Sequence, residues 1–320
     1  MNARILAAAT LVVVFCGVLP AGAADPQLLN LMMPDAKIVA GVNVDQAKTT
    51  PFGQYVLLQV QSQQGAHMQA LAALTGFDPT RDVSELLVAS GGAPGAHQGL
   101  VVARGTFDAV KIAAAATAAG GVTEAYGGAT IIEDPKKQSG FAFLSAIYVA
   151  AGDVVNVKAA IDRLKSVSVL PAALATQIGQ LSTAEDAWVI STVAPSTLKT
   201  PAAIPNIPGL GANGGSAFQN ILSASAGVKF GANAVVTAQA EADNAQDAAS
   251  MAGVLQLLIN VMKTQAAQNA QAAAVAQGLT VTAQGSLINV TLSVPEDQLQ
   301  QLLAQPRTAA PNHRRPARRM

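Results

Sequence analysis

Cysteine is almost absent from this chain. Cys16 is the only one among 320 residues, and it lies in an apolar N-terminal segment that we expect to be removed. The mature protein is therefore expected to have neither disulfides nor thiolate chemistry. Its stability must come from a hydrophobic core, and a chain of this length with 51% hydrophobic residues can build one.

Histidine is nearly as rare, which argues against a metal centre. His67, His97 and His313 are isolated from one another in sequence, and no His-Glu-x-x-His or paired-cysteine pattern occurs. Residues 209–214 fit the Gly-x-Gly-x-x-Gly pattern of dinucleotide-binding proteins. However, they follow a proline-rich loop instead of a strand, and no acidic residue lies about 20 positions later. We expect no cofactor.

No apolar run after Pro20 is long enough to span a membrane. The N-terminus has the pattern of a secretory signal: Arg4, an apolar run over residues 5–19, and small residues at positions 21–24. We therefore expect residues 1–24 to be a signal peptide, with the mature chain starting near Ala24 or Asp25. The protein is expected to be exported, to the periplasm or the extracellular space.

Charged residues make up only 12% of the chain, and their signs are unevenly distributed. Residues 25–306 hold 13 basic and 19 acidic residues. The tail, residues 306–320, is basic and interrupted by prolines, so we expect it to be disordered. Its last arginines are Arg314, Arg315, Arg318 and Arg319.

The basic tail suggests an anionic partner. It could hold the protein to anionic lipid heads or acidic wall polymers, at about 1 kcal/mol per residue near a charged membrane surface. A solvated end that improves solubility is the alternative. Nucleic acid is not expected to bind, because the acidic body repels it and no aromatic residue interleaves the arginines.

Strand and helix signals occur twice in a similar order, which predicts an α+β fold of two loosely duplicated halves, each with antiparallel strands and packed helices. The halves are residues 25–168 and 169–305. The first half is expected to contain a strand at 38–44, a hairpin of 83–88 with 99–103, a helix from 109, and a meander at 130–132, 141–149 and 154–157. The second is expected to contain a strand at 187–193, a hairpin of 226–230 with 234–240, a helix over 243–277, and a hairpin of 279–282 with 287–294.

One short motif suggests catalysis. Ser196-Thr197-Leu198-Lys199 matches the Ser-x-x-Lys pattern, in which a lysine one helical turn away assists deprotonation of a nucleophilic serine. The supporting Lys-Thr-Gly element is absent, and prolines at 195 and 201 leave room for one short turn. A serine acyl enzyme acting on peptidoglycan or β-lactams is therefore the alternative hypothesis. Otherwise Ser196 is a helix cap and Lys199 is solvated.

Four segments carry a resemblance to a known group. They are Met33-Pro34-Asp35-Ala36, Pro51-Phe52-Gly53, Gly76-Phe77-Asp78-Pro79 with Arg81-Asp82-Val83, and Ala103-Arg104-Gly105-Thr106-Phe107-Asp108. Their order resembles exported bacterial proteins of unknown function, mainly over residues 30–165. These segments are turns and caps, so the resemblance implies a shared fold and no particular activity.

Together these patterns favour an exported, non-catalytic binding or scaffold protein of the cell envelope, with an unknown envelope component as its partner. A further alternative is an interaction protein whose apolar helix at 243–277 docks a partner. An exposed apolar stripe on that helix would support docking, and a buried stripe would make it part of the core.

The tail hypothesis predicts the result of a fractionation experiment. If the arginines form an electrostatic tether, the full-length protein should pellet with the envelope and be released by high salt, which screens charge pairs. A chain ending at Pro306 should stay in the soluble fraction. If both forms are soluble, the tail is only a solvated end.

Overall fold

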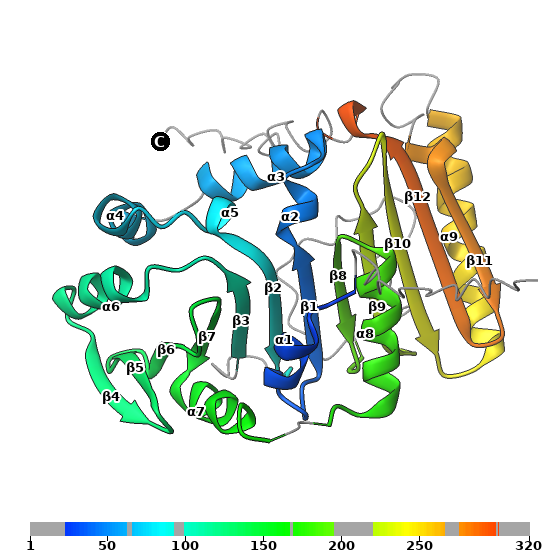
Figure 1. Ribbon diagram of the computed structural model, residues 1–320. Coiled ribbons are helices and arrows are strands. Elements are labelled where there is room, and N and C mark those ends of the chain that lie inside the picture. Colours follow the sequence, from blue (N-terminus) through cyan, green and yellow to red (C-terminus); the bar gives the residue numbers. More distant parts are fainter. Residues whose placement is uncertain are drawn as a thin grey trace, which may run out of the picture.

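The computed structural model describes residues 23–62, 66–92, 99–166, 169–194, 220–265, 275–298 and 300. Within these ranges the strands form a single sheet of twelve, in the order β11-β12-β10-β9-β8-β1-β2-β3-β7-β6-β5-β4 (Figure 1). All of its pairings are antiparallel. The predicted class, α+β with antiparallel strands, is confirmed.

The strands are β1 (Ile38–Asn43), β2 (Val83–Ser90), β3 (Gly99–Gly105), β4 (Val122–Tyr126), β5 (Ala129–Asp134), β6 (Ser139–Phe143), β7 (Tyr148–Asp153), β8 (Ala187–Ser191), β9 (Ile221–Lys229), β10 (Asn233–Ala242), β11 (Leu279–Gln284) and β12 (Leu287–Pro295). The helices are α1 (Pro26–Leu31), α2 (Val44–Ala47), α3 (Pro51–Ser62), α4 (Ala66–Thr75), α5 (Pro79–Asp82), α6 (Ala109–Ala118), α7 (Val154–Arg163), α8 (Ala172–Ala184) and α9 (Ala245–Gln265).

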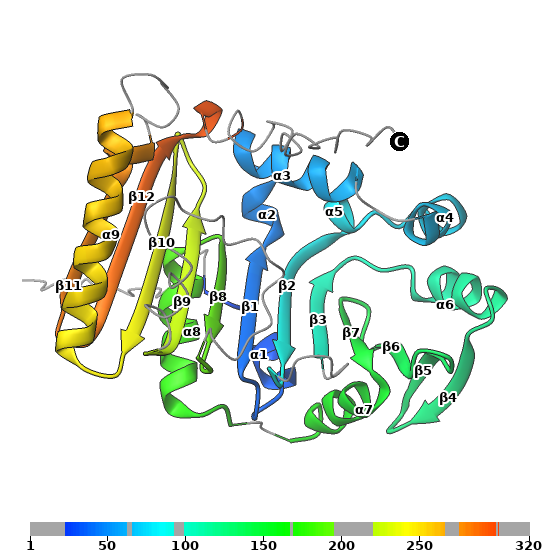
Figure 2. The same ribbon diagram turned by 180° about the vertical axis from the view of Figure 1, so that it is seen from behind.

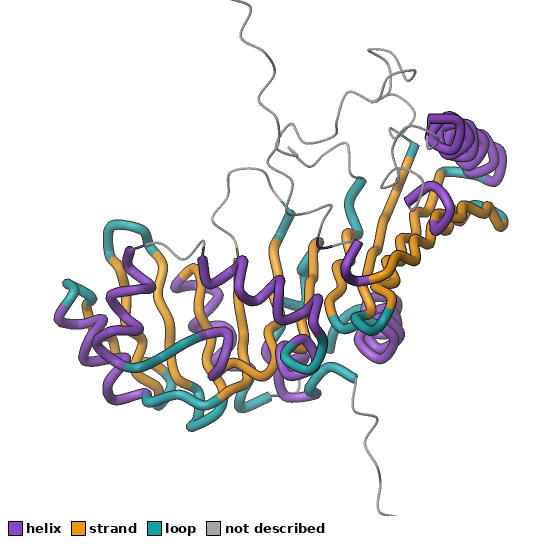
Figure 3. The backbone as a smooth tube through the Cα atoms, turned by 90° about the horizontal axis from the view of Figure 1, so that it is seen from above, coloured by secondary structure: helices purple, strands orange, loops and turns teal. Residues whose placement is uncertain are grey.

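Helices lie on both faces of a curved sheet (Figure 3). The helices α1 and α8 lie over the central strands on one face, and α7 packs on the same face over β3, β5, β6 and β7; we call this the packed face (Figure 1). Its core contains Leu28 and Leu31 of α1, Ile161 of α7, and Leu174 and Ile178 of α8, packed on alternate side chains of the strands beneath. The helix α9 lies on the opposite face, over β10, β11 and β12 (Figure 2).

The two halves of the chain meet where β1 pairs with β8. The register places Gly41 opposite Trp188 and Val39 opposite Ile190. Trp188 is buried and its ring lies over Gly41 on the packed face, so a larger residue at position 41 would displace the ring.

Strand order repeats outward from this pair. One side reads β1-β2-β3-β7-β6 and the other reads β8-β9-β10-β12-β11. On each side a first strand leads to two adjacent strands, a helix (α6 or α9) and a hairpin. The β4–β5 pair has no counterpart among the described residues of the second half. A common origin of the two halves stays a prediction.

Two predicted strands differ from the structure. The stretch 141–149, expected as one strand, is divided between β6 and β7 by residues 144–147. Residues 154–157 were expected to be extended, but they form the first turn of α7. Val157, Ala160 and Ile161 are buried at helical spacing against the packed face. Burial of this helical stripe outweighs the strand preference of three valines at positions 154, 155 and 157.

We expect Gly41→Ala to destabilise the protein. An added Cβ would lie 2.5 Å from two ring carbons of Trp188 and 2.8 Å from Leu87 Cδ2. Overpacking of this kind costs about 1–3 kcal/mol, which urea denaturation can measure. Gly179→Ala in α8 is the matched control, because nothing lies within 4 Å of its added Cβ. An equal effect of both substitutions would contradict this account.

Candidate functional site

The face of the sheet opposite α1, α7 and α8 carries two parallel rows of small and apolar side chains, which we call the alanine rows. One row runs across Ala40, Val189, Ala226, Ala238 and Val290. The other runs across Ile38, Ser191, Ala224, Ala240 and Ile288. Because side chains alternate between faces along each strand, the residues of both rows point to this same face.

The side chains in the middle of the alanine rows are the smallest. Alanine occupies both positions on β9 and both on β10, whereas β12 carries Ile288 and Val290, β8 carries Val189 and β1 carries Ile38. Met251 and Leu255 of α9 form a wall beside β12. The result is a groove of about 480 Å³ between α9 and the sheet, which we call the apolar groove.

No acidic, basic or histidine side chain is among the described residues that line the apolar groove. The hydroxyl of Ser191 donates to the carbonyl oxygen of Val193 at 2.9 Å, so it is already satisfied. Gln239 lies on the strand position that faces away, and its amide donates to Asn289 Oδ1 at 2.9 Å. Val189, on the groove floor, remains 39% exposed. The groove can therefore exclude water from an apolar ligand, but it offers no acid, base or nucleophile.

The helix α9 is more buried than the docking alternative requires. A helix was expected over residues 243–277; the structure describes α9 over Ala245–Gln265 and helical residues again at 275–278, and residues 266–274 lie outside the described part of the chain. Its apolar stripe is buried against the sheet through Ala248, Met251, Ala252 and Ile259. This stripe belongs to the core, so docking of a partner onto it is not supported.

The catalytic and tether residues proposed from the sequence lie outside the described residues. This applies to Ser196 and Lys199, to the arginines at 314, 315, 318 and 319, to His97 and His313, and to residues 209–214. Both hypotheses therefore stay predictions. His67 lies in α4. Across the described ranges, no group of histidine, cysteine and acidic residues is close enough to hold a metal ion.

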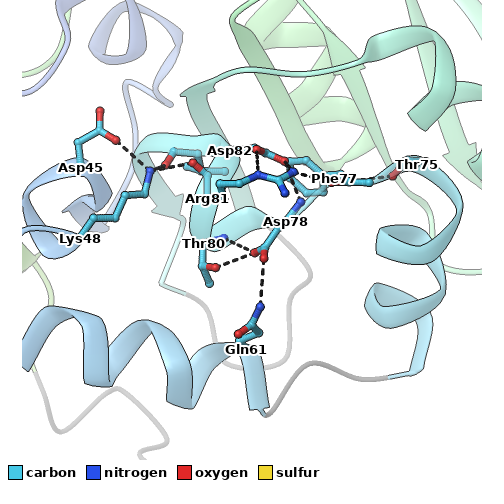
Figure 4. Close-up of polar contacts among 11 residues, drawn as sticks. Asp45, Lys48, Gln61, Thr75, Phe77, Asp78, Thr80, Arg81 and Asp82 are labelled. Atoms are coloured by element: carbon cyan, nitrogen blue, oxygen red, sulfur yellow. Dashed lines mark hydrogen bonds and ion pairs between the residues drawn. The ribbon is translucent and has the colours of Figure 1, made fainter.

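One of the segments that carried the resemblance, Gly76-Phe77-Asp78-Pro79 with Arg81-Asp82-Val83, forms a structural unit around α5, shown in Figure 4. Asp78 caps α5, and its carboxylate accepts from the Thr80 amide at 2.9 Å and from Gln61 Nε2 at 3.0 Å. Arg81 holds Asp82 through Nε at 2.7 Å and Nη2 at 2.8 Å. The hydrogen bond from Arg81 lowers the pKa of Asp82 and outweighs the effect of partial burial.

Another segment that carried the resemblance, Ala103-Arg104-Gly105-Thr106-Phe107-Asp108, packs against this unit. The Thr106 amide donates to the Asp82 carbonyl oxygen at 2.8 Å, and the rings of Phe77 and Phe107 lie 6.0 Å apart. A Cβ at Gly105 would collide with the Asp82 carbonyl. These residues therefore join the start of β2 to the end of β3, which is a structural role.

Within the described part of the chain, no helix combines the length and apolar character needed to cross a bilayer.

No protein-family model matches the chain, and no curated protein matches it significantly. Two crystal structures of TP0453 are similar in fold. Crystal form III gives a TM-score of 0.55 at 8% identity, covering 86% of this chain and 96% of that chain. Crystal form I gives a TM-score of 0.53 at 9% identity, covering 87% and 96%. At this identity the likeness establishes a shared fold alone.

We expect Asp78→Ala to lower the free energy of unfolding by about 1 kcal/mol, because it removes an N-cap acceptor. Asp78→Asn keeps a side-chain oxygen at the cap and should lose less. Thermal or urea unfolding of the two variants measures the difference. If the alanine variant were as stable as the wild type, the unit in Figure 4 would not help to hold the fold.

Proposed function

We propose that this chain is an exported, non-catalytic binding protein of the cell envelope, and that its ligand is an extended hydrocarbon chain held in the apolar groove. The apolar groove is the observation that carries the proposal. Its volume of about 480 Å³ lies within the usual range of ligand sites.

The shape of the groove supports a long, narrow ligand. The alanine rows cross five adjacent strands, β1, β8, β9, β10 and β12. At ~4.8 Å between neighbouring strands, they extend about 19 Å. Two rows on one face of a strand lie two residues apart, or about 7 Å. An acyl chain has these proportions.

The chemistry of the lining supports an uncharged ligand segment. Each CH₂ group moved from water into the groove contributes about 0.8 kcal/mol. A charged group would lose its hydration without finding a partner, because no ionisable side chain of the described residues lines the groove. We infer that a polar head group, if the ligand has one, stays outside.

Export and the arginine tail belong to the same proposal. A signal peptide over residues 1–24 would deliver the protein to the envelope, where acyl chains are abundant. Arg314, Arg315, Arg318 and Arg319 would then bring it close to anionic lipid heads or acidic wall polymers. The two contributions to binding can be tested separately. The tail contributes affinity for a charged surface, and the groove binds an apolar chain.

The proposal predicts that filling the groove abolishes binding. Ala226→Phe places a ring in the middle of the alanine rows and should weaken binding of a fluorescent fatty acid by roughly tenfold or more, since each tenfold is about 1.4 kcal/mol. Fluorescence titration of the delipidated protein measures this. The control is Thr282→Phe, at an exposed position of β11 that points to the other face of the sheet.

Circular dichroism must show that both variants are folded. Wild-type affinity in a folded Ala226→Phe protein would place the probe elsewhere and contradict the proposal. Mass spectrometry of lipids extracted from the purified wild-type protein would then distinguish a free fatty acid from the acyl chain of a membrane lipid.

A further inference from the structure

Charged side chains converge on the main-chain nitrogen of Asp25, close to the expected end of the signal peptide. This nitrogen donates to Glu85 Oε1 at 3.0 Å. Arg104 lies between the two acids, with Nε 3.2 Å from Asp25 Oδ2 and Nη2 3.5 Å from Glu85 Oε2. The Tyr148 hydroxyl donates to Asp25 Oδ2 at 2.9 Å. We call these four residues the Asp25 cluster.

The Asp25 cluster is built by four different elements. Asp25 is the N-cap of α1, Glu85 is on β2, Arg104 is on β3 and Tyr148 is on β7. Glu85 is only 8% exposed, and the Asp25 side chain is 17% exposed. The N-cap residue of α1 is thus anchored to three strands of the packed face.

The charges of the Asp25 cluster do not balance. Asp25 and Glu85 are both acids, and Arg104 is the one cation among the four residues. Tyr148 adds no charge at neutral pH, because a phenol has an ordinary pKa of about 10. Burial and its hydrogen bond to Asp25 raise that pKa further. One negative charge is therefore left over at a poorly hydrated site. Burial also raises the pKa of Glu85, which shows how unfavourable the charged form is there.

We propose that the signal peptide is cut between Ala24 and Asp25, and that the new α-ammonium group of Asp25 pairs with Glu85. In this step a signal peptidase adds water across the Ala24–Asp25 peptide bond. Ala24 leaves with a carboxylate, and the freed amine of Asp25 takes up a proton. The nitrogen that donates to Glu85 as an amide then donates as a cation, and the cluster becomes neutral.

The competing cut, after Ala23, does not balance the cluster. It would place the ammonium one residue away from the nitrogen that contacts Glu85. Ala24 is 7% exposed and packs against the core, so this cut would retain one small apolar contact. Pairing a buried carboxylate contributes more than one alanine methyl group, so the geometry favours Asp25 as the first residue.

The pair makes stability depend on pH in a defined direction. An α-amino group titrates at about 7.7–8.0 when it has no partner. The Glu85 carboxylate raises this pKa in the folded protein, so the stabilisation is fully present below the unfolded value and is lost as pH rises through the folded value. For each pKa unit by which folding raises the pKa of the Asp25 α-amino group, Tm should fall by about 2–4 °C. The fall takes place between the unfolded and the folded pKa of this group.

The first test is the intact mass of the protein purified after export of the full-length chain. We expect a mature chain that begins with Asp25. A chain beginning with Ala24 or any other residue overturns this inference and leaves export and the apolar groove untouched. Absence of cleavage would contradict export as well.

The second test compares the Tm of the exported wild type and Glu85→Gln between pH 7 and about pH 9.5. The wild type should lose Tm over this range, and the variant should lose less because its amide cannot stabilise an ammonium. Glu241→Gln is the control, since Glu241 is exposed and contacts Ser223 instead. Parallel pH profiles of wild type and Glu85→Gln would overturn the pairing, even if the cut is where we place it.

Discussion

The antiparallel pairing of β1 with β8 is the interaction on which the rest of the structure depends. Each half of the chain supplies a set of strands that ends at this seam, and the seam makes one continuous sheet of them. The absence of a side chain at Gly41 leaves room for the ring of Trp188 within the packed face. The core of α1, α7 and α8 can then run unbroken from one half to the other.

The β1–β8 pairing also determines which side chains point to the opposite face of the sheet. Because strands alternate their side chains, burial of Val39, Leu87 and Ile190 under helices turns Ile38, Ala40 and Val189 to the opposite side. On that side α9 lies mainly over β10, β11 and β12, and it reaches Ile221 at the start of β9. The alanine rows lie next to α9, and the space left by four alanines is the apolar groove.

Buried acids in this protein serve mainly to hold backbone. Glu296 accepts from the amides of Phe52 and Gly231, both at 3.0 Å, and so ties α3 to the turn between β9 and β10. Asp186 accepts from the Phe230 amide at 2.7 Å and pairs with Lys229 at 2.7 Å. Such charge-assisted bonds satisfy carboxylates that burial would otherwise penalise. The Asp25 cluster differs because two acids, Asp25 and Glu85, share one cation, Arg104.

The sequence by itself determined the class of fold and several of its elements. Alternating apolar residues located β1 and β8, and glycine and aspartate turns located the β2–β3 and β9–β10 pairs, because these signals depend on neighbours a few residues apart. The strand β4 was missed, since its residues are largely exposed and lack an apolar alternation. The start of α7 was assigned to a strand because its valines are β-branched, a strand signal that the folded chain does not follow.

Only the tertiary structure decided where a ligand could bind. The alternation of alanines at 224, 226, 238 and 240 is visible in the sequence, yet alanine is a weak strand former and carries no chemical signal of its own. These residues become a groove floor because the register of β9 on β10, and of β8 on β1, brings them beside one another. The Asp25 cluster likewise joins Asp25 to residues 60 or more positions further along the chain. Long-range strand register set both sites, and it follows from packing of the whole sheet.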